Sequence, residues 1–127
     1  MINYNIGIQL TKNSEKYLGL ISDLQSKNNV NCINISSDDV LKENFSSLDI
    51  LVTHRMNDVL FSYATDRLKW IHFGSAGIEG SLFPAILKSK TIITNSSGIH
   101  ADSVSEFVIA SMLVIMVGKI FLIGYYS

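Results

Sequence analysis

Three short polar segments contain the residue types that could bind or transform a small anion. They are residues 53–55 (THR), 74–80 (GSAGIEG) and 95–102 (NSSGIHAD). The glycines of the second segment permit turns in which successive backbone N–H groups converge on an anion, and a carboxylate is the expected ligand. The alternative is a purely structural turn, because the segment lacks the glycine and lysine of a P-loop and the full G-x-G-x-x-G pattern of a dinucleotide loop.

Side chains in and near these segments suggest further roles. Arg55 could supply a forked guanidinium contact to a carboxylate, and the alternative is an ion pair on the surface. His54, His72 and His100 are candidate acid–base groups, although their spacing gives neither a nucleophile–base triad nor a metal site. His72 falls in a strand-like alternation, which favours a structural role. For His100 a position at the entry to a helix is the alternative to acid–base chemistry.

Alternating strand and helix patterns should position these segments. Apolar runs predict strands at residues 6–10, 30–35, 48–52, 68–73 and 91–94, the third of them covered on both faces. Helical patterns occupy residues 14–26, 57–64 and 82–87, the last broken near Pro84, and residues 36–39 offer caps for a further helix. This order predicts an α/β fold, a parallel sheet with helices on both faces. Its ligands should lie beyond the carboxyl ends of the strands.

The last helix has the clearest local signal. Ser103 and Glu106 form an S-x-x-E capping box, which predicts that the helix begins at Ser103. Residues 107–117 are nearly all apolar, so this helix should be buried by its own domain, a second domain or another subunit. Residues 108–126 nearly span a bilayer in length, but Lys119 within them weighs against a membrane tail. A membrane-spanning tail is the alternative.

Length and composition exclude several classes of protein. The chain has 127 residues, 47% of them hydrophobic, which suits one globular domain. Its net charge of -1, without a basic block, argues against a nucleic-acid partner. The single Cys32 excludes an intrachain disulfide and the usual zinc sites, and fits a reducing compartment. Because the first residues form no secretory signal, we expect a cytoplasmic protein.

Three motifs in order resemble the D-isomer-specific 2-hydroxyacid dehydrogenases. They are residues 68–79 (LKWIHFGSAGIE), 92–101 (IITNSSGIHA) and 103–106 (SVSE). The resemblance is strong from residue 68 to residue 113 and weak before residue 50. It implies that residues 1–101 form the flavodoxin-like substrate-binding (catalytic) domain of that family, and that residues 102–117 form an interdomain or dimer helix.

The resemblance also implies roles for individual residues. It places the backbone N–H groups of Ala76 and Gly77 on the substrate carboxylate, with Ser75 beside them. Arg55 is expected to assist there. Val104 would face the nicotinamide of NAD or NADP across an interdomain cleft.

Other positions depart from the family pattern. Glu79 stands where the family usually has Asp, and Glu106 is expected to hold structure near the helix start. The dinucleotide-binding domain of the family supplies the G-x-G-x-x-G loop and the catalytic Arg, Glu and His, none of which has a counterpart here. Residues 118–127 resemble the start of that domain's first strand, with Tyr126 in place of its second glycine. We therefore expect a truncated chain that is inactive alone, with neither catalytic nor metal-binding residues of its own.

The function that the resemblance implies is the substrate-binding part of an oxidoreductase. The enzyme would act on the CH–OH group of D-2-hydroxy acids with NAD(P) as acceptor. Its partners would be a small 2-hydroxy or 2-keto acid and a second copy of the chain, bound through the helix starting at Ser103. The alternatives are a carboxylate-binding module without catalysis and a membrane-tethered domain.

Overall fold

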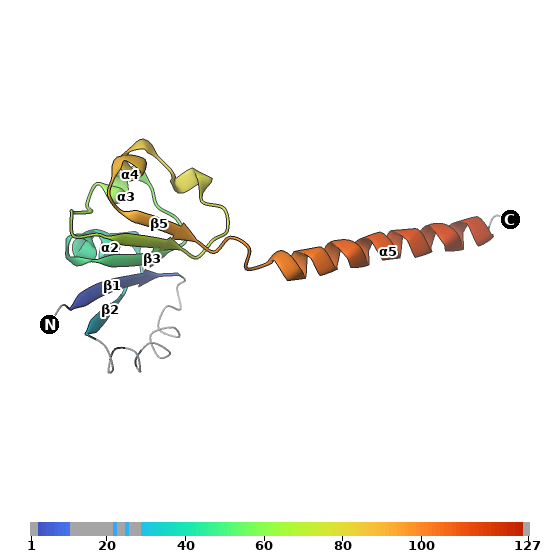
Figure 1. The fold of residues 1–127 in the computed structure, drawn as a ribbon, viewed down its shortest axis with the longest axis horizontal. Coiled ribbons are helices and arrows are strands. Elements are labelled where there is room, and N and C mark those ends of the chain that lie inside the picture. The colour runs from blue at the N-terminus through green and yellow to red at the C-terminus, as the bar shows by residue number, and fades with distance from the viewer. Residues whose placement is uncertain (1–2, 11–21, 23–24, 26–28, 126–127) are drawn as a thin grey trace. The chain divides into compact units, whose positions relative to one another are not determined.

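The chain forms two separate units. The computed structural model describes residues 3–10, 22, 25 and 29–125 (Figure 1). The first unit spans Met1–Ser96 and contains a β-sheet, and the second spans Ser97–Ser127 and contains one long helix. The segments at residues 53–55 and 74–80 therefore belong to the first unit, whereas His100 and Val104 belong to the second.

Five parallel strands make up the sheet of the first unit. They are β1 (Tyr4–Gln9), β2 (Val30–Asn34), β3 (Ile50–Thr53), β4 (Trp70–Phe73) and β5 (Ile92–Asn95), in the order β2-β1-β3-β4-β5 (Figure 1). This flavodoxin-like order confirms the predicted α/β class. The order changes direction between β1 and β3. In such sheets ligands bind in the crevice beyond the carboxyl ends of the two strands at that point.

Short helices connect the strands. They are α2 (Asp38–Asn44), α3 (Asp58–Phe61) and α4 (Pro84–Lys88), with 3-10 turns η1 (Phe45–Ser47) and η2 (Glu79–Ser81). Ser37 caps α2 by accepting the N–H of Val40 at 3.3 Å, and Asn57 caps α3 in the same way. The helix predicted at residues 14–26 lies outside the described residues, apart from Ser22 and Gln25.

The predicted break near Pro84 is wrong. Pro84 is the first residue of α4, which runs on to Lys88. A proline ring fixes a backbone angle that suits the first helical turn, and its missing N–H would have no partner within the helix there. Pro84 therefore starts a helix instead of interrupting one.

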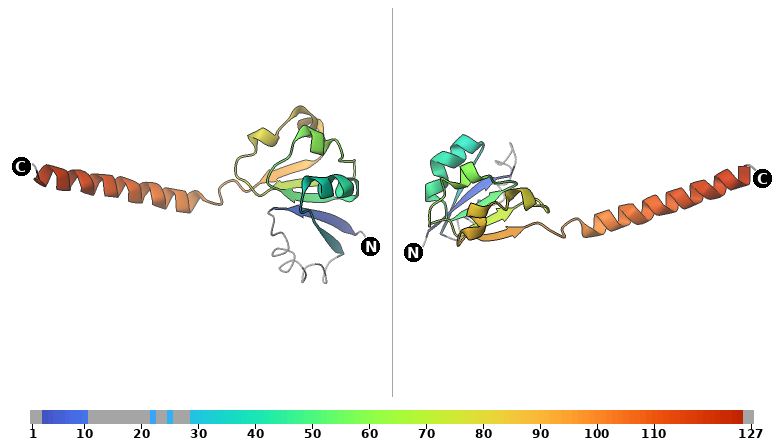
Figure 2. Two further views of the ribbon diagram at one scale, coloured as in Figure 1. Left: turned by 180° about the vertical axis from the view of Figure 1, so that it is seen from behind. Right: turned by 90° about the horizontal axis from the view of Figure 1, so that it is seen from above.

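One face of the sheet is packed against α2, α3 and α4. Leu51 and Ile71 lie in one row across the sheet and are fully buried, as are helix residues such as Leu41 and Ile86. Gly7 shares this row, and a Cβ there would lie 2.7 Å from Leu48 Cδ1. A side chain at this position would require the buried side chains of Leu48 and Leu51 to shift. In the left view of Figure 2, the α2 helix lies between the viewer and the strands.

The opposite face of β3, β4 and β5 is less covered. Val52 is half-buried, and Trp70 and Ile92 have exposed fractions of 39% and 63%. The prediction that the strand at residues 48–52 is covered on both faces therefore holds for one face only in the part of the chain that the structure describes. The covered face supplies the core, so the sheet has one buried face and one half-exposed face.

The second unit is the helix α5 (Ala101–Tyr125), which is 25 residues long. Its side chains from Val104 to Val117 are mostly exposed, and it has no polar face. Over Ala101–Lys119 the helix is long and apolar enough to cross a membrane, judged by length and composition alone. A helix that is apolar all round requires an apolar environment.

The predicted start of this helix is wrong. Gly98, with φ of 86°, turns the chain just before the helix, and its carbonyl oxygen accepts the N–H of Ala101 at 3.1 Å. The helix therefore begins two residues before Ser103. The side chains of Ser103 and Glu106 form no hydrogen bond or ion pair with the described residues, so the capping box is not made.

The strand predicted at the end of the chain is also not formed. Residues 118–125 continue α5, which ends at Tyr125. No proline interrupts the run, and Gly118 costs only about 1 kcal/mol relative to alanine in a helix. Helical hydrogen bonding therefore extends through the segment that resembles a strand.

Asp49 ties together the amino ends of three strands. Its carboxylate accepts the Asn5 N–H at 2.8 Å and two N–H groups of Arg67 at 3.1 and 3.0 Å. Its backbone carbonyl oxygen accepts the Lys69 N–H at 2.8 Å, at the start of β4. Burial alone would raise the pKa of Asp49, but the hydrogen bonds from Arg67 and Asn5 outweigh it and hold the pKa below its usual value.

We predict that this carboxylate makes folding stability sensitive to acid. Because the pKa of Asp49 is lowered in the folded state, its contribution is present at neutral pH and is lost as the pH falls below about 4. Asp49→Asn should lower the free energy of unfolding by about 1–2 kcal/mol at pH 7 and by less near pH 3.5. Urea unfolding followed by the fluorescence of Trp70, the single tryptophan, measures this.

The matched control is Asp39→Asn. Asp39 forms an exposed pair with Lys42 at 2.9 Å, so its loss should change the free energy of unfolding much less than the loss of the Asp49 carboxylate. Equal losses for the two variants, or a loss at Asp49 that does not change with pH, would contradict the assignment.

Candidate functional site

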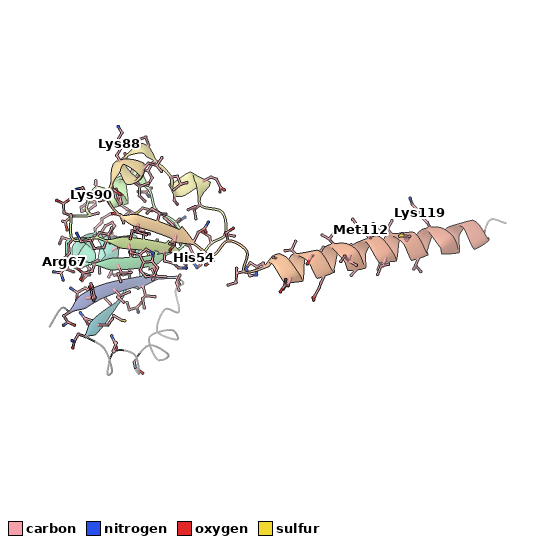
Figure 3. All side chains as sticks on the ribbon, viewed as in Figure 1. His54, Arg67, Lys88, Lys90, Met112 and Lys119 are labelled. Carbon is pink, nitrogen blue, oxygen red and sulfur yellow. The ribbon has the colours of Figure 1, made fainter. Side chains whose placement is uncertain are left out.

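The loops after β3, β4 and β5 begin at one edge of the sheet. Thr53, Phe73 and Asn95, the last residues of these strands, lie side by side in register. The Gly74 N–H donates to the carbonyl oxygen of Thr53 at 2.8 Å, which joins the first two loops at their origin. His54 marks this edge in Figure 3. The predicted loops of residues 53–55 and 74–80 are therefore neighbours.

The bend after β4 directs two backbone N–H groups away from β5. Ser75 O accepts the Ser96 N–H at 3.2 Å, and Ala76 O accepts Asn95 Nδ2 at 2.8 Å. In a trans peptide the N–H points opposite to the preceding carbonyl, and the described chain has no cis peptide. The N–H groups of Ala76 and Gly77 therefore point away from β5. Neither donates a hydrogen bond within the described residues.

The glycines of the loop after β4 do not adopt left-handed backbone conformations. Among the described residues only Gly98 has a positive φ, so the loop after β4 presents its amides from a bend and not from a left-handed turn. Gly74 is instead required by close approach. A Cβ there would lie 2.9 Å from Leu10 Cδ2 and 3.1 Å from His54 Cε1.

Arg55 is a cation without an ionic partner in the described part of the chain. The two ion pairs found there are Lys42–Asp39 and Arg67–Asp49. The surface ion pair considered for Arg55 is therefore not formed with the described residues. Buried Thr53 fixes the start of the loop, because its Oγ1 lies 3.1 Å from both Arg55 O and Gln9 Oε1. Arg55 thus follows β3, a strand at the point where the sheet order changes direction.

Glu79 brings a negative charge to the loop. Its Oε2 lies 3.1 Å from the position that a Cβ on Gly77 would take, and its side chain is exposed. The carboxylate therefore lies beside one of the two unpaired amides. An incoming anion would meet an attractive amide and a like charge at the same place.

Of the three histidines, the structure brings His54 to this loop. Its ring lies against Gly74, and its carbonyl oxygen accepts Ser75 Oγ at 3.1 Å. His100 and Val104 belong to the second unit, where both are exposed. The described residues include no group of three His, Cys, Asp or Glu that could hold a metal ion. Burial raises the pKa of the Cys32 thiol, which disfavours a reactive thiolate.

His72 lies on the half-exposed face of the sheet and has partners at both ring nitrogens. Trp70 Nε1 donates to Thr94 Oγ1 at 2.8 Å, and the same oxygen lies 2.9 Å from His72 Nδ1. On the other side His72 Nε2 lies 3.3 Å from Ser96 Oγ, which donates to the Phe73 carbonyl oxygen. This chain of contacts makes His72 a structural link between β4 and β5.

The partners of His72 are not predictable from the sequence alone. Trp70 and His72 alternate in β4, and Thr94 pairs with His72 across the sheet. The alternation was a usable signal, but the facing residue depends on the register between strands. The hydrogen bonds of the Thr94 hydroxyl and the Trp70 indole therefore become assignable only once the strand register is known.

The donors in this cluster predict one tautomer of neutral His72. Because Ser96 Oγ donates its one proton to Phe73 O, it can only accept from His72 Nε2, so the ring proton should lie on Nε2. His72 Nδ1 then accepts the Thr94 hydroxyl proton, while Thr94 Oγ1 accepts the Trp70 Nε1–H. Long-range ¹H–¹⁵N correlation of the imidazole ring should show this pattern, and Thr94→Val should change it. A proton on Nδ1 in the unsubstituted chain would contradict the assignment.

Comparisons with protein-family models, with curated proteins and with solved structures found no match to this chain. The resemblance to the D-2-hydroxyacid dehydrogenases therefore stays a prediction from the motifs of the sequence.

Proposed function

We propose that the first unit binds the carboxylate of a small 2-hydroxy or 2-keto acid. The observation that carries the proposal is the pair of adjacent N–H groups on Ala76 and Gly77, which have no acceptor among the described residues. Backbone N–H groups that are left unpaired together form a favourable site for an anion. Two neighbouring donors match the two oxygens of one carboxylate.

Neighbouring side chains support this ligand class. Arg55 adds a positive charge without a partner in the described part of the chain, and a guanidinium can hold a carboxylate through two parallel hydrogen bonds. His54, which lies against Gly74, is the candidate partner for a hydroxyl or keto oxygen on C2. A small acid with oxygen on C2 would satisfy all of these groups.

The proposed enzyme is an NAD(P)-dependent D-2-hydroxyacid dehydrogenase, in which this chain is the substrate-binding half. Hydride transfer at C2 requires a bound nicotinamide, and the cofactor supplies that chemistry. The sequence has no G-x-G-x-x-G segment, so the proposal assigns the cofactor to a dinucleotide-binding domain outside residues 1–127. The task of this chain would be to hold and orient the acid. A role for Val104 beside the nicotinamide stays part of the same proposal.

We predict that Arg55→Gln weakens binding of pyruvate by about tenfold, because it removes one charge-assisted contact at an exposed site. Isothermal titration calorimetry of the full chain measures the dissociation constant. Arg55→Lys keeps the charge but not the fork, so its affinity should lie between those of the other two proteins. Methyl pyruvate, which lacks the carboxylate, is the control ligand and should not bind.

Glu79→Gln should act in the opposite direction in the same titration. Two like charges about 6 Å apart in water repel by about 0.7 kcal/mol, so removing the Glu79 charge should strengthen pyruvate binding about threefold. Equal affinities for all the proteins, or equal binding of methyl pyruvate, would overturn the carboxylate site.

A membrane-tethered domain is the second candidate, and the exposed apolar surface of α5 favours it. On this account the full chain should float with phosphatidylcholine vesicles and resist carbonate extraction. Val114→Asp places a charge in mid-helix that opposes insertion by about 3 kcal/mol, and it should abolish flotation. Recovery of the unsubstituted chain in the soluble fraction without detergent would exclude this candidate.

A further inference from the structure

A cavity of about 440 Å³ lies at the amino end of the sheet. It is lined by residues between 61 and 69, which precede β4, and by residues 88–91, which precede β5. Because all strands are parallel, residues that precede them lie at the edge opposite to the carboxylate loops. We call this cavity the lysine cleft. Nothing in the proposed function uses it.

Positive charge is concentrated in the lysine cleft. Lys69, Lys88 and Lys90 line it, and Asp66 is the acidic residue among its lining residues, which leaves a local excess of two positive charges. The complete chain, by contrast, has a net charge of -1. In the described part of the chain, the ammonium groups of Lys88 and Lys90 form no hydrogen bond or ion pair. Figure 3 shows both lysines at the end of the sheet away from His54.

The cleft also has an apolar part. Leu68 is buried, and Phe61 is half-buried with its ring edge against Phe83 at a centroid distance of 5.6 Å. With Ala64 these side chains give an apolar wall beside the lysine ammonium groups. A ligand that fills such a site combines a flat apolar group with negative charge.

Hydrogen bonds join the segments that form the walls of the cleft. Thr91 Oγ1 donates to Leu68 O at 3.2 Å, which joins the segment before β5 to the segment before β4. Ser89 Oγ donates to Ile86 O at 2.7 Å and accepts the Thr91 N–H at 3.2 Å. The hydroxyls of the cleft therefore hold its shape, and the free lysines supply its binding groups. A preformed site loses less entropy when a ligand binds.

We propose that the lysine cleft binds a phosphate monoester that carries a flat apolar group. A phosphate monoester has a charge of about -1.5 to -2 at pH 7, which matches the excess positive charge of the cleft. The apolar group would lie on Phe61, Ala64 and Leu68, and Lys88 and Lys90 would hold the phosphate oxygens. A carboxylic acid carries one charge and would balance the cleft only in part. The chain would then have two ligand sites, at opposite edges of one sheet.

Phenyl phosphate is the probe that tests this proposal. The full chain is titrated by calorimetry in maltoside micelles, which contain no phosphate group. We expect phenyl phosphate to bind, inorganic phosphate to bind more weakly and phenol not to bind. Lys88→Gln and Lys90→Gln should each weaken binding of phenyl phosphate about tenfold, since each removes one charge-assisted hydrogen bond.

Lys42→Gln is the matched control, because it removes the same charge from an exposed helix outside the cleft. It should leave phenyl phosphate binding unchanged. An equal loss in Lys42→Gln, or no binding of phenyl phosphate to the unsubstituted chain, would overturn the proposal. Binding seen only to phosphatidic acid placed in the micelle would also overturn it and assign the cleft to a lipid headgroup. Pyruvate affinity should stay unchanged in the Lys88 and Lys90 variants, which separates this site from the proposed carboxylate site.

Discussion

The parallel pairing of β3, β4 and β5 is the constraint on which the rest of the first unit depends. It places the last residues Thr53, Phe73 and Asn95 at one level, so that three loops begin at the same edge. At the end of the neighbouring strand β5, the Ser96 N–H and Asn95 Nδ2 donate hydrogen bonds to carbonyl oxygens of the bend after β4. Since a trans peptide points its N–H the other way, this pairing leaves two amides free of β5. The proposed ligand site therefore depends on strand register and not on a special loop conformation.

The same pairing gives the sheet two chemically different edges. At the carboxyl edge lie the unpaired backbone amides, Arg55 and Glu79; on our proposal the amides and Arg55 would hold a small carboxylate, and Glu79 would lower its affinity. At the amino edge, Asp49 and Arg67 neutralise one another and hold three strands together, whereas Lys88 and Lys90 stay without partners among the described residues. This edge therefore carries one structural ion pair, Asp49 with Arg67, and two lysines without an ionic partner in the described part of the chain. Each edge could then bind its own anion.

How much the sequence revealed depended on how local the signal was. The apolar runs that became β3 and β4, and the α/β class, were predictable because strand periodicity is a property of neighbouring residues. The start of α5 was not, because Gly98 and the backbone of Ala101 begin the helix before the Ser103 pattern. For the candidate site, the loops and their order were found, but the direction of the amides depends on contacts with β5. The lysine cleft joins residues about 20 positions apart, and no local pattern marks it.

The most direct test of the carboxylate site is to observe its backbone amides. Backbone ¹H–¹⁵N spectra of the full chain, recorded while pyruvate is added, report each N–H separately. We expect the signals of Ala76 and Gly77 to move most, and methyl pyruvate to cause no such change. Signals that move instead at the amino edge of the sheet, or no movement at saturating pyruvate, would show that these two amides do not bind a carboxylate.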